Sequence, residues 1–315
     1  MNKSRYIDWL NKICCCNHRL ISYPIILLFI GCIATIKAHA QCFSCAMAPP
    51  GTIWCDDFED SIPLAQKYFE YNNDDGDFIR LAGAGRNNSY GMRVIFQPGE
   101  EEAGNLKKSF GRTPGAYISR TSVNATQQYS EIFWRIDIRM QPGWAGNPFK
   151  LSRATSLVDS TWAQGMMAHI WSGGKGFALT MDPASGIDTS GNILSTRYND
   201  FGHLRWLGFK GGNIPLFDTR NAGNWYCIEG HAKLNTPGQQ DGIFEFWVND
   251  TLQAGSYNLN WHGSYNAVPG SYMINAVFFE NYWNNGSPVQ QERYFDNIVI
   301  STKRIGCACR LQHSD

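Results

Sequence analysis

The chain has 315 residues and no formal net charge, because 27 basic side chains balance 27 acidic ones. It has no long run of Lys or Arg, whereas nucleic-acid binding needs a concentrated basic face, so a nucleic-acid partner is not expected. Aromatic residues make up 14% of the chain, with 11 Trp. Such a composition suits either a β-rich core or a surface that stacks on flat apolar faces such as sugar rings.

The N-terminal segment has the order of features found in secretory signals. Lys3, Arg5 and Lys12 give it a positive start, residues 25–36 form a short apolar run, and an Ala-x-Ala sequence ends at Ala40. The apolar run is too short to span a bilayer comfortably. This pattern predicts a signal peptide that is cleaved after Ala40.

Cleavage would divide the chain into a signal over 1–40 and a single domain over 41–315, with no membrane span in the mature protein. The mature protein is then secreted or periplasmic. Two alternatives remain open. Residues 29–32, Phe-Ile-Gly-Cys, loosely resemble a lipobox, which would anchor the protein by a lipid at the cell surface. The leader can also be retained as a membrane anchor.

The cysteines that remain after cleavage are even in number, which favours disulfides in an oxidising compartment. Because the termini of a sandwich are often neighbours, bridges between an N-terminal and a C-terminal pair are attractive, but the sequence does not fix the pairing. A zinc site formed by the four terminal cysteines is disfavoured by export and by the C-x-C spacing. The six residues are Cys42, Cys45, Cys55, Cys227, Cys307 and Cys309.

Short runs separated by Gly, Asn, Asp and Pro predict strands along most of the mature chain, and only residues 61–68 suggest a helical turn. Many short strands with turns between them predict an all-β sandwich or barrel. No linker or internal repeat divides the chain. The clearest strands span 92–97, 131–140, 165–171, 176–182, 225–234, 243–249, 271–279 and 294–301.

Two of these strands, 131–140 and 225–234, alternate between an apolar face and a charged one, as expected for strands with one buried face. The charged faces carry Arg-Asp-Arg and Glu-His-Lys, which is more charge than solvation requires. They can line a functional groove or form a salt-bridged outer face. The residues are Arg135, Asp137, Arg139, Glu229, His231 and Lys233.

Four stretches resemble the concanavalin A-like jelly-roll proteins that include bacterial, viral and fungal alginate and glucuronan lyases. They are CDDFED at 55–60, EIFWRIDIRMQPGW with NPFKLSRA within 131–154, WYCIEGHAKLNTPGQQDGIFEFWVND at 225–250, and FFENYWNNGSP with RYFDNIVISTKRIG within 278–306. The resemblance implies an all-β, two-sheet antiparallel jelly-roll sandwich. It is less specific for activity, because this fold hosts lectins, hydrolases, lyases and inert modules.

Hydrolysis of a glycosidic bond requires two carboxylates at a set separation. Hydrolases of this fold usually carry them as E-x-D-x-x-E or E-x-D-x-E, and neither pattern occurs in the chain. The sequence therefore disfavours a retaining hydrolase of the usual jelly-roll kind.

β-Elimination on a uronate polymer requires a group that neutralises the substrate carboxylate, a base and an acid. Arg, Lys, Asn, His and Tyr can fill these roles. Only Lys150 lies in a stretch that matches the lyases well enough to carry a position across, and their Tyr-x-Tyr pair is not evident. We assign catalysis to Lys150, His169, His231 and Tyr282, and substrate binding to Arg135, Arg139, Arg153, Tyr198, Asn281 and Trp283.

The segment 280–288 gathers amide and aromatic side chains, including Asn281 and Trp283, in one predicted loop. Such a set suits stacking on apolar sugar faces and hydrogen bonding to hydroxyls. The alternative is an Asn-Gly turn whose Trp covers the edge of the core.

The resemblance also implies a structural Ca²⁺ between the first and last strands. Asp57, Glu59 and Asp296 stand in the matching segments, and Ca²⁺ binds carboxylate and carbonyl oxygens. Hydrogen bonding and turn capping are the alternative roles for these carboxylates.

The sequence thus predicts a secreted, monomeric polysaccharide-active protein, and specifically a lyase acting on an anionic glycan. A non-catalytic carbohydrate-binding or cell-surface module is the alternative, and a structural exported protein is the third. An enzyme is expected to gather Arg135, Lys150, His169, His231 and Tyr282 in one groove.

Overall fold

The computed structural model describes residues 43–172 and 176–307. The predicted leader therefore lies outside the described residues. Within the described part, no helix is long and apolar enough to cross a membrane.

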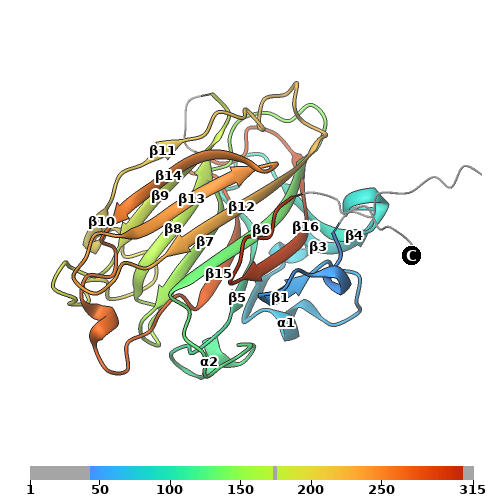
Figure 1. Ribbon diagram of the computed structural model, residues 1–315. Coiled ribbons are helices and arrows are strands. Elements are labelled where there is room, and N and C mark those ends of the chain that lie inside the picture. The colour runs from blue at the N-terminus through green and yellow to red at the C-terminus, as the bar shows by residue number, and fades with distance from the viewer. Residues whose placement is uncertain (1–42, 173–175, 308–315) are drawn as a thin grey trace, which may run out of the picture. The chain divides into compact units, whose positions relative to one another are not determined.

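The described chain forms two antiparallel sheets of eight strands each, which confirms the predicted jelly-roll sandwich (Figure 1). In sheet A the strands run in the order β14 (Thr251–Leu259), β13 (Gly242–Val248), β12 (Trp225–Lys233), β6 (Glu131–Met140), β16 (Gln291–Ser301), β4 (Tyr90–Phe96) and β3 (Phe78–Ala82), and β1 (Thr52–Asp56) also pairs with β16.

In sheet B the order is β10 (Arg205–Trp206), β9 (Leu179–Ser185), β8 (Gln164–Ser172), β7 (Lys150–Leu157), β15 (Ala276–Tyr282), β5 (Glu102–Ser109) and β2 (Glu70–Asn72), with β11 (Lys210–Gly211) also on β9. Helical turns are few and short. They are α1 (Leu64–Lys67), inside the predicted turn, α2 (Ala116–Ser119), and 3₁₀ turns at Cys45–Met47, Asp74–Gly76, Arg86–Asn88, Phe201–His203 and Tyr265–Ala267.

The core lies between the two sheets, as the alternation in β6 predicts. Ile132 and Trp134 and the apolar residues that follow on the same face are all buried there. Trp134 also reaches the opposite sheet, because its indole Nε1 donates a hydrogen bond of 3.1 Å to Ser152 Oγ on β7. Its ring leaves no room on β12: a Cβ at Gly230 would lie 2.4 Å from the ring. Glycine at this position therefore lets the Trp lie flat against the strand.

Two disulfides are described, Cys45–Cys55 and Cys227–Cys307. Disulfide bonding is thus confirmed for these four cysteines, but neither bridge joins the two ends of the chain, so the cross-terminal expectation is wrong for Cys45 and Cys307. Each instead fastens a terminal segment to a nearby strand. Cys42 and Cys309, and with them the four-cysteine zinc alternative, lie outside the described residues.

Candidate active site

A groove crosses the outer face of sheet B. It consists of two cavities of about 180 Å³ and about 220 Å³ that share Lys150, Tyr282 and Phe201 as lining residues. Lys150 begins β7 and Tyr282 ends β15, and the two residues face each other across these paired strands. Besides β7 and β15, the segment between β9 and β10 lines the groove, and it contributes Tyr198, Asn199 and Phe201. The structure thus brings Lys150 and Tyr282 together, as predicted.

Lys150 is a largely buried lysine without a counter-ion in contact among the described residues. Its side chain makes no hydrogen bond or ion pair with any residue in the described ranges, and its Nζ lies 3.9 Å from the centroid of the Tyr282 ring. Burial lowers the pKa of the Lys150 ammonium, partly offset by attraction to Glu280, while nearby Arg153 lowers it further. A lysine in such a position can lose its proton more readily than a solvated one, as a general base must.

The pKa of the Tyr282 hydroxyl is shifted in the opposite direction. Partial burial and the nearby carboxylates of Glu101 and Glu102 raise the pKa of Tyr282, so the phenol keeps its proton at neutral pH. Adjacent groups whose environments move their pKa values apart are typical of acid–base pairs. Lys150 and Tyr282 therefore suit the roles of base and acid respectively.

Arg153 is the centre of a buried network beneath the groove. It is fully buried, and its guanidinium donates to Glu280 Oε1 at 2.9 Å, to Asn199 Oδ1 at 2.8 Å and to the Tyr198 hydroxyl. Tyr198 in turn donates to Glu280 Oε1 at 3.0 Å. Burial alone would raise the pKa of Glu280, but Arg153, Lys150 and Lys107 outweigh it and hold that pKa below its usual value. Arg153 and Tyr198 thus use their polar atoms on each other, and the arrangement contradicts direct substrate binding by Arg153.

Asn199 is a group that the sequence did not single out. Its backbone is left-handed (φ 52°), and its N–H donates to Gln164 Oε1 at 3.1 Å. Because Arg153 donates to Oδ1, the amide nitrogen is the end left for other partners, and it has none in the described part of the chain. Asn199 lines the groove, so its amide can donate a hydrogen bond to a ligand there.

His169 lies below the groove rather than in it. It is fully buried, and its ring contacts that of Trp171 at a centroid distance of 4.0 Å. Its Nδ1 lies 3.0 Å from the Asp182 carbonyl oxygen. Burial chiefly, and the positive charge of Arg153 in addition, hold the pKa of His169 well below its usual value, so the ring is neutral. This burial contradicts the predicted catalytic contact with substrate.

Aromatic rings form one wall of the groove. Phe201 and Trp206 are 42% and 43% exposed, and their rings lie nearly parallel with centroids 6.1 Å apart. Trp171 and Phe149 line the same cavity. Exposed, nearly parallel rings beside polar groups suit stacking on sugar faces. Only a general excess of aromatics is visible in the sequence, because these four residues come from three separate segments.

The comparisons with known proteins bear on the fold. No protein-family model matches the sequence, and no curated protein matches it. Among solved structures, an endo-β-1,4-glucuronan lyase from the fungus Trichoderma reesei has 11% identity and a TM-score of 0.52 over 83% of this chain and 100% of that one. An alginate lyase from Chlorella virus has 13% identity and a TM-score of 0.52 over 74% and 91%. The marine PL-14 alginate lyase from Aplysia kurodai has 14% identity and a TM-score of 0.52 over 80% and 99%. The likeness is one of fold. It confirms the jelly-roll resemblance that the sequence motifs indicate.

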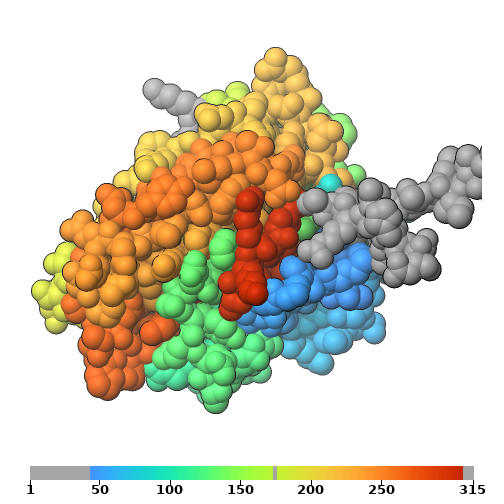
Figure 2. All heavy atoms as spheres, in the orientation of Figure 1, coloured from blue at the N-terminus to red at the C-terminus, as the bar shows by residue number. Residues whose placement is uncertain are grey.

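The charged faces of β6 and β12 do not contribute to the groove, because both strands belong to sheet A. Figure 2 shows this side of the molecule, with the yellow-to-orange atoms of β12, β13 and β14 beside the green of β6. His231 lies between Glu245 and Glu131, at 2.9 Å and 2.8 Å, and its ring stacks on Phe133. The expectation of one groove that also holds Arg135 and His231 is therefore wrong, and the alternative of a salt-bridged outer face is right.

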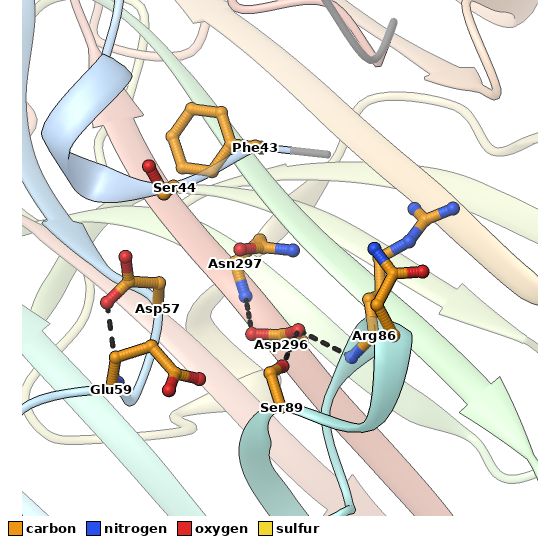
Figure 3. Close-up of a pocket in the computed structure, with 9 residues that line it drawn as sticks. Phe43, Ser44, Asp57, Glu59, Arg86, Ser89, Asp296 and Asn297 are labelled. Carbon is orange, nitrogen blue, oxygen red and sulfur yellow. Dashed lines mark hydrogen bonds between the residues drawn. The ribbon is translucent and has the colours of Figure 1, made fainter. Parts of the chain in front are cut away.

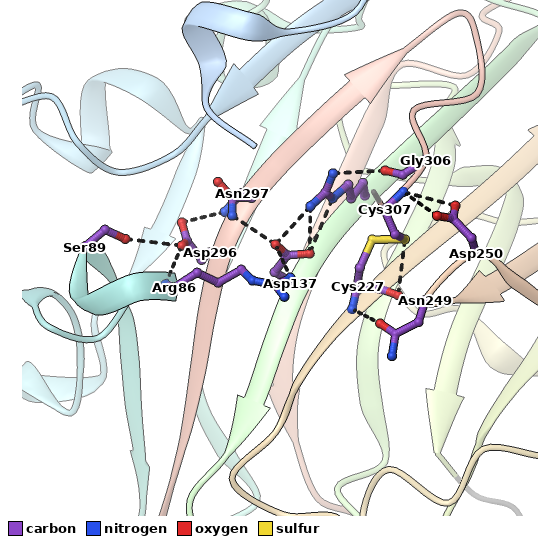
Figure 4. Close-up of polar contacts among 11 residues, drawn as sticks. Arg86, Ser89, Asp137, Cys227, Asn249, Asp250, Asp296, Asn297, Gly306 and Cys307 are labelled. Atoms are coloured by element: carbon purple, nitrogen blue, oxygen red, sulfur yellow. Dashed lines mark hydrogen bonds and ion pairs between the residues drawn. A yellow bond between two sulfur atoms is a disulfide. The ribbon is translucent and has the colours of Figure 1, made fainter. Parts of the chain in front are cut away.

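The two arginines of β6 are likewise held within sheet A. Arg135 forms an ion pair with buried Asp137 at 3.0 Å and donates to the Gly306 carbonyl oxygen at 2.9 Å. Figure 4 shows Asp137 and Gly306 near the Cys227–Cys307 bridge. The Arg139 guanidinium lies over the rings of Trp225 and Tyr294. Their assignment to substrate binding in the groove is therefore wrong. The alternation of apolar and charged residues along β6 identifies a polar face, but it does not tell which of the two sheets carries the site.

Asn281 and Trp283 use their side chains in structural contacts, although Asn281 also lines the groove. Asn281 is buried, donates to the Gly104 carbonyl oxygen at 3.1 Å and accepts from Arg293 at 2.6 Å. The Trp283 ring packs in the core against Phe96 and Trp144. This burial contradicts a stacking role for Trp283 and favours the alternative of a Trp that covers the edge of the core.

The three carboxylates proposed for Ca²⁺ line a separate cavity of about 180 Å³ (Figure 3). Burial chiefly, and the charges of Asp137 and Glu59 in addition, raise the pKa of Asp296 to about 7. Three carboxylates in one cavity are groups that suit a cation. Each carboxylate already accepts a backbone N–H, however: Asp57 from Cys45, Glu59 from Tyr90 and Asp296 from Arg86. No three His, Cys, Asp or Glu residues in the described ranges are arranged to hold a metal ion. Calcium stays a prediction for this cavity.

Proposed function

We propose that the protein is an exported lyase that cleaves a uronate-containing polysaccharide by β-elimination in the groove over sheet B. The observation that carries the proposal is the pairing of Lys150 and Tyr282, two adjacent groups whose pKa values are shifted in opposite directions. The lyase fold and the aromatic wall support it. The two disulfides are compatible with export.

In this proposal the substrate carboxylate accepts a hydrogen bond from the Asn199 amide, which makes the neighbouring C–H more acidic. Neutral Lys150 removes that proton from C5. The electron pair of the C–H bond forms a C4–C5 double bond as the C4–O4 bond breaks. The Tyr282 hydroxyl gives its proton to the leaving oxygen. Arg153 and Glu280 position Tyr198 and Asn199 from below and do not touch the substrate.

A direct assay tests the proposal. The purified protein is incubated with alginate, glucuronan and heparin-like polymers while the ultraviolet absorbance of the unsaturated product is followed. A rise on at least one of them supports the lyase. If folded protein produces no rise on any uronate polymer, the lyase proposal fails.

A non-catalytic carbohydrate-binding module is the second candidate. It is favoured by the exposed pair Phe201 and Trp206, and by the burial of His169 and Arg153, which removes two of the predicted functional groups from contact with a ligand. Binding of a glycan without cleavage, measured by calorimetry on the same polymers, would decide for the module.

A further inference from the structure

A further cavity of about 650 Å³ adjoins the groove and is used by none of the steps above. It shares Phe149 and Asn284 with the aromatic end of the groove, so the two hollows are neighbours. Its volume falls in the range of about 300–1,000 Å³ that is typical of small-molecule sites. It lies between the loop over 143–149 and the loop over 283–288, next to the end of β8.

The walls of this cavity are fixed by hydrogen bonds. Gln291 accepts from the Ala145 N–H at 2.9 Å and donates to the Ala145 carbonyl oxygen at 2.9 Å, and it also donates to Ser287 Oγ at 3.0 Å. Gly146, with φ 79°, lies against the Trp283 ring, where an added Cβ would come within 3.1 Å. The two loops are thus tied to each other, and the hollow between them is built into the fold.

Three lining residues have a buried polar atom without a hydrogen-bond partner in the described chain. They are Ser172 with its Oγ, Trp283 with its Nε1 and Asn147 with its Oδ1. Ser172 and Trp283 are only 1% and 6% exposed. An unpaired buried polar group is costly, and several of them around one hollow indicate that a polar ligand completes their hydrogen bonds.

The chemistry of these groups selects the ligand. None of the residues that line the cavity is ionisable, whereas the neighbouring groove contains Lys150, Lys107 and Glu280. An indole N–H donates, an amide oxygen accepts, and a serine hydroxyl does both. This set suits the hydroxyl groups of an uncharged sugar, and the lining has no cation to pair with a carboxylate.

We infer that this cavity is a subsite for a neutral sugar unit. Combined with the proposed function, on which this second step rests, the substrate is a mixed polysaccharide in which a neutral sugar stands next to the uronate held at Lys150. A pure uronate polymer would place a charged carboxylate in a cavity whose lining has no cation, and it is expected to be the poorer ligand there.

Calorimetric titration of the full protein tests the subsite without depending on cleavage. The probes are cellobiose and mannobiose as neutral disaccharides, a glucuronate–glucose disaccharide as the mixed unit, and alginate and glucuronan oligosaccharides as pure uronates. Ser172→Ala is expected to weaken binding of the neutral and mixed probes about five- to tenfold, the worth of one hydrogen bond, and to leave uronate binding unchanged. Asn147→Ala, at a partly exposed position, is expected to act in the same way and gives a second result if Ser172→Ala does not fold.

Ser156→Ala is the matched control. Ser156 is also a fully buried serine on sheet B whose Oγ lacks a partner in the described ranges, but it does not line this cavity. Equal effects of the two serine variants, or no effect of either cavity variant, would overturn the subsite. Cleavage of pure uronates without any binding of neutral or mixed probes would overturn it too and leave the lyase standing. Neutral binding in the absence of uronate cleavage would support the subsite and contradict the lyase.

Discussion

Lys150 and Tyr282 are direct cross-strand partners on β7 and β15, and the Lys150 Nζ lies 3.9 Å from the centre of the Tyr282 ring. The ring shields the ammonium from water on one side, and the strand pairing fixes the distance between the two groups. A one-residue shift in register would turn one of them toward the core. The proposed acid–base pair is therefore a consequence of strand register.

Replacing Lys150 by Met keeps the length of the side chain and removes the base. We expect kcat on a uronate polymer to fall about 10²–10⁴-fold, the usual contribution of a general base. Lys210→Met is the control, because Lys210 is an exposed lysine at β11 that lines neither groove cavity. Equal activities of the Lys150→Met and wild-type proteins would remove Lys150 from the mechanism.

The lowered pKa of Lys150 also predicts how activity depends on pH. The base is active only when Lys150 is neutral, and its pKa is lowered by burial, so activity rises with pH and reaches its plateau below the pH at which an ordinary lysine deprotonates. Because the pKa of Tyr282 is raised, the alkaline limb is expected beyond the ordinary tyrosine range. The measurement is kcat/KM against pH for the wild-type and Tyr282→Phe proteins, and an alkaline limb that persists in Tyr282→Phe would contradict the assignment of the acid.

Replacing one member of the Arg153–Glu280 pair is predicted to destabilise the protein more than replacing both. Arg153→Met leaves the Glu280 carboxylate buried without its main counter-charge and is expected to cost about 3–5 kcal/mol of unfolding free energy. Arg153→Met combined with Glu280→Leu removes both charges and is expected to recover most of that loss. Urea unfolding of the wild-type protein, Arg153→Met, Glu280→Leu and the double variant gives the comparison, and a double variant that loses the sum of both single effects would contradict the coupling.

The raised pKa of Asp296 predicts how the stability of the protein depends on pH. Its pKa is about 7 in the folded protein, raised chiefly by burial, against 3.8 for an ordinary aspartate. The folded state therefore holds a proton between these values that the unfolded state has lost, so stability falls as pH rises from about 4 to about 7, by on the order of 4 kcal/mol at most. Asp296→Asn is expected to flatten this dependence.

Calcium is tested in the same unfolding experiment. If Ca²⁺ binds beside Asp296, added CaCl₂ raises the urea midpoint of the wild-type protein more at pH 8 than at pH 5, because the cation and the proton compete for the carboxylate. Chelation with EDTA reverses the gain, and Asp296→Asn removes it. Equal midpoints with CaCl₂ and with EDTA at pH 8 would reject the predicted ion.

The sequence was sufficient for the sandwich but only partly for the site. Alternation in β6 identifies the buried face of sheet A correctly, because that strand has one face in the core and one toward solvent. β7 and β15 lack such a contrast: the segment that carries Tyr198 and Asn199 covers their outer face, so polar residues such as Glu280 are buried as deeply as apolar ones. That segment has no periodic pattern, and only folding brings it over Lys150.

The aromatic wall is predicted to act in binding rather than in the chemical step. Trp206→Ala removes an exposed ring that touches no reacting group, and stacking on a sugar contributes about 0.5–1.5 kcal/mol, so KM is expected to rise about two- to tenfold while kcat changes little. Tyr257→Ala is the control, because Tyr257 is an aromatic of similar exposure on β14 of the opposite sheet. Steady-state kinetics on a uronate polymer give both constants. A fall in kcat at constant KM would instead place Trp206 among the groups that hold the Lys150–Tyr282 pair in position, since its ring lies 6.1 Å from that of Trp171 on the strand next to β7.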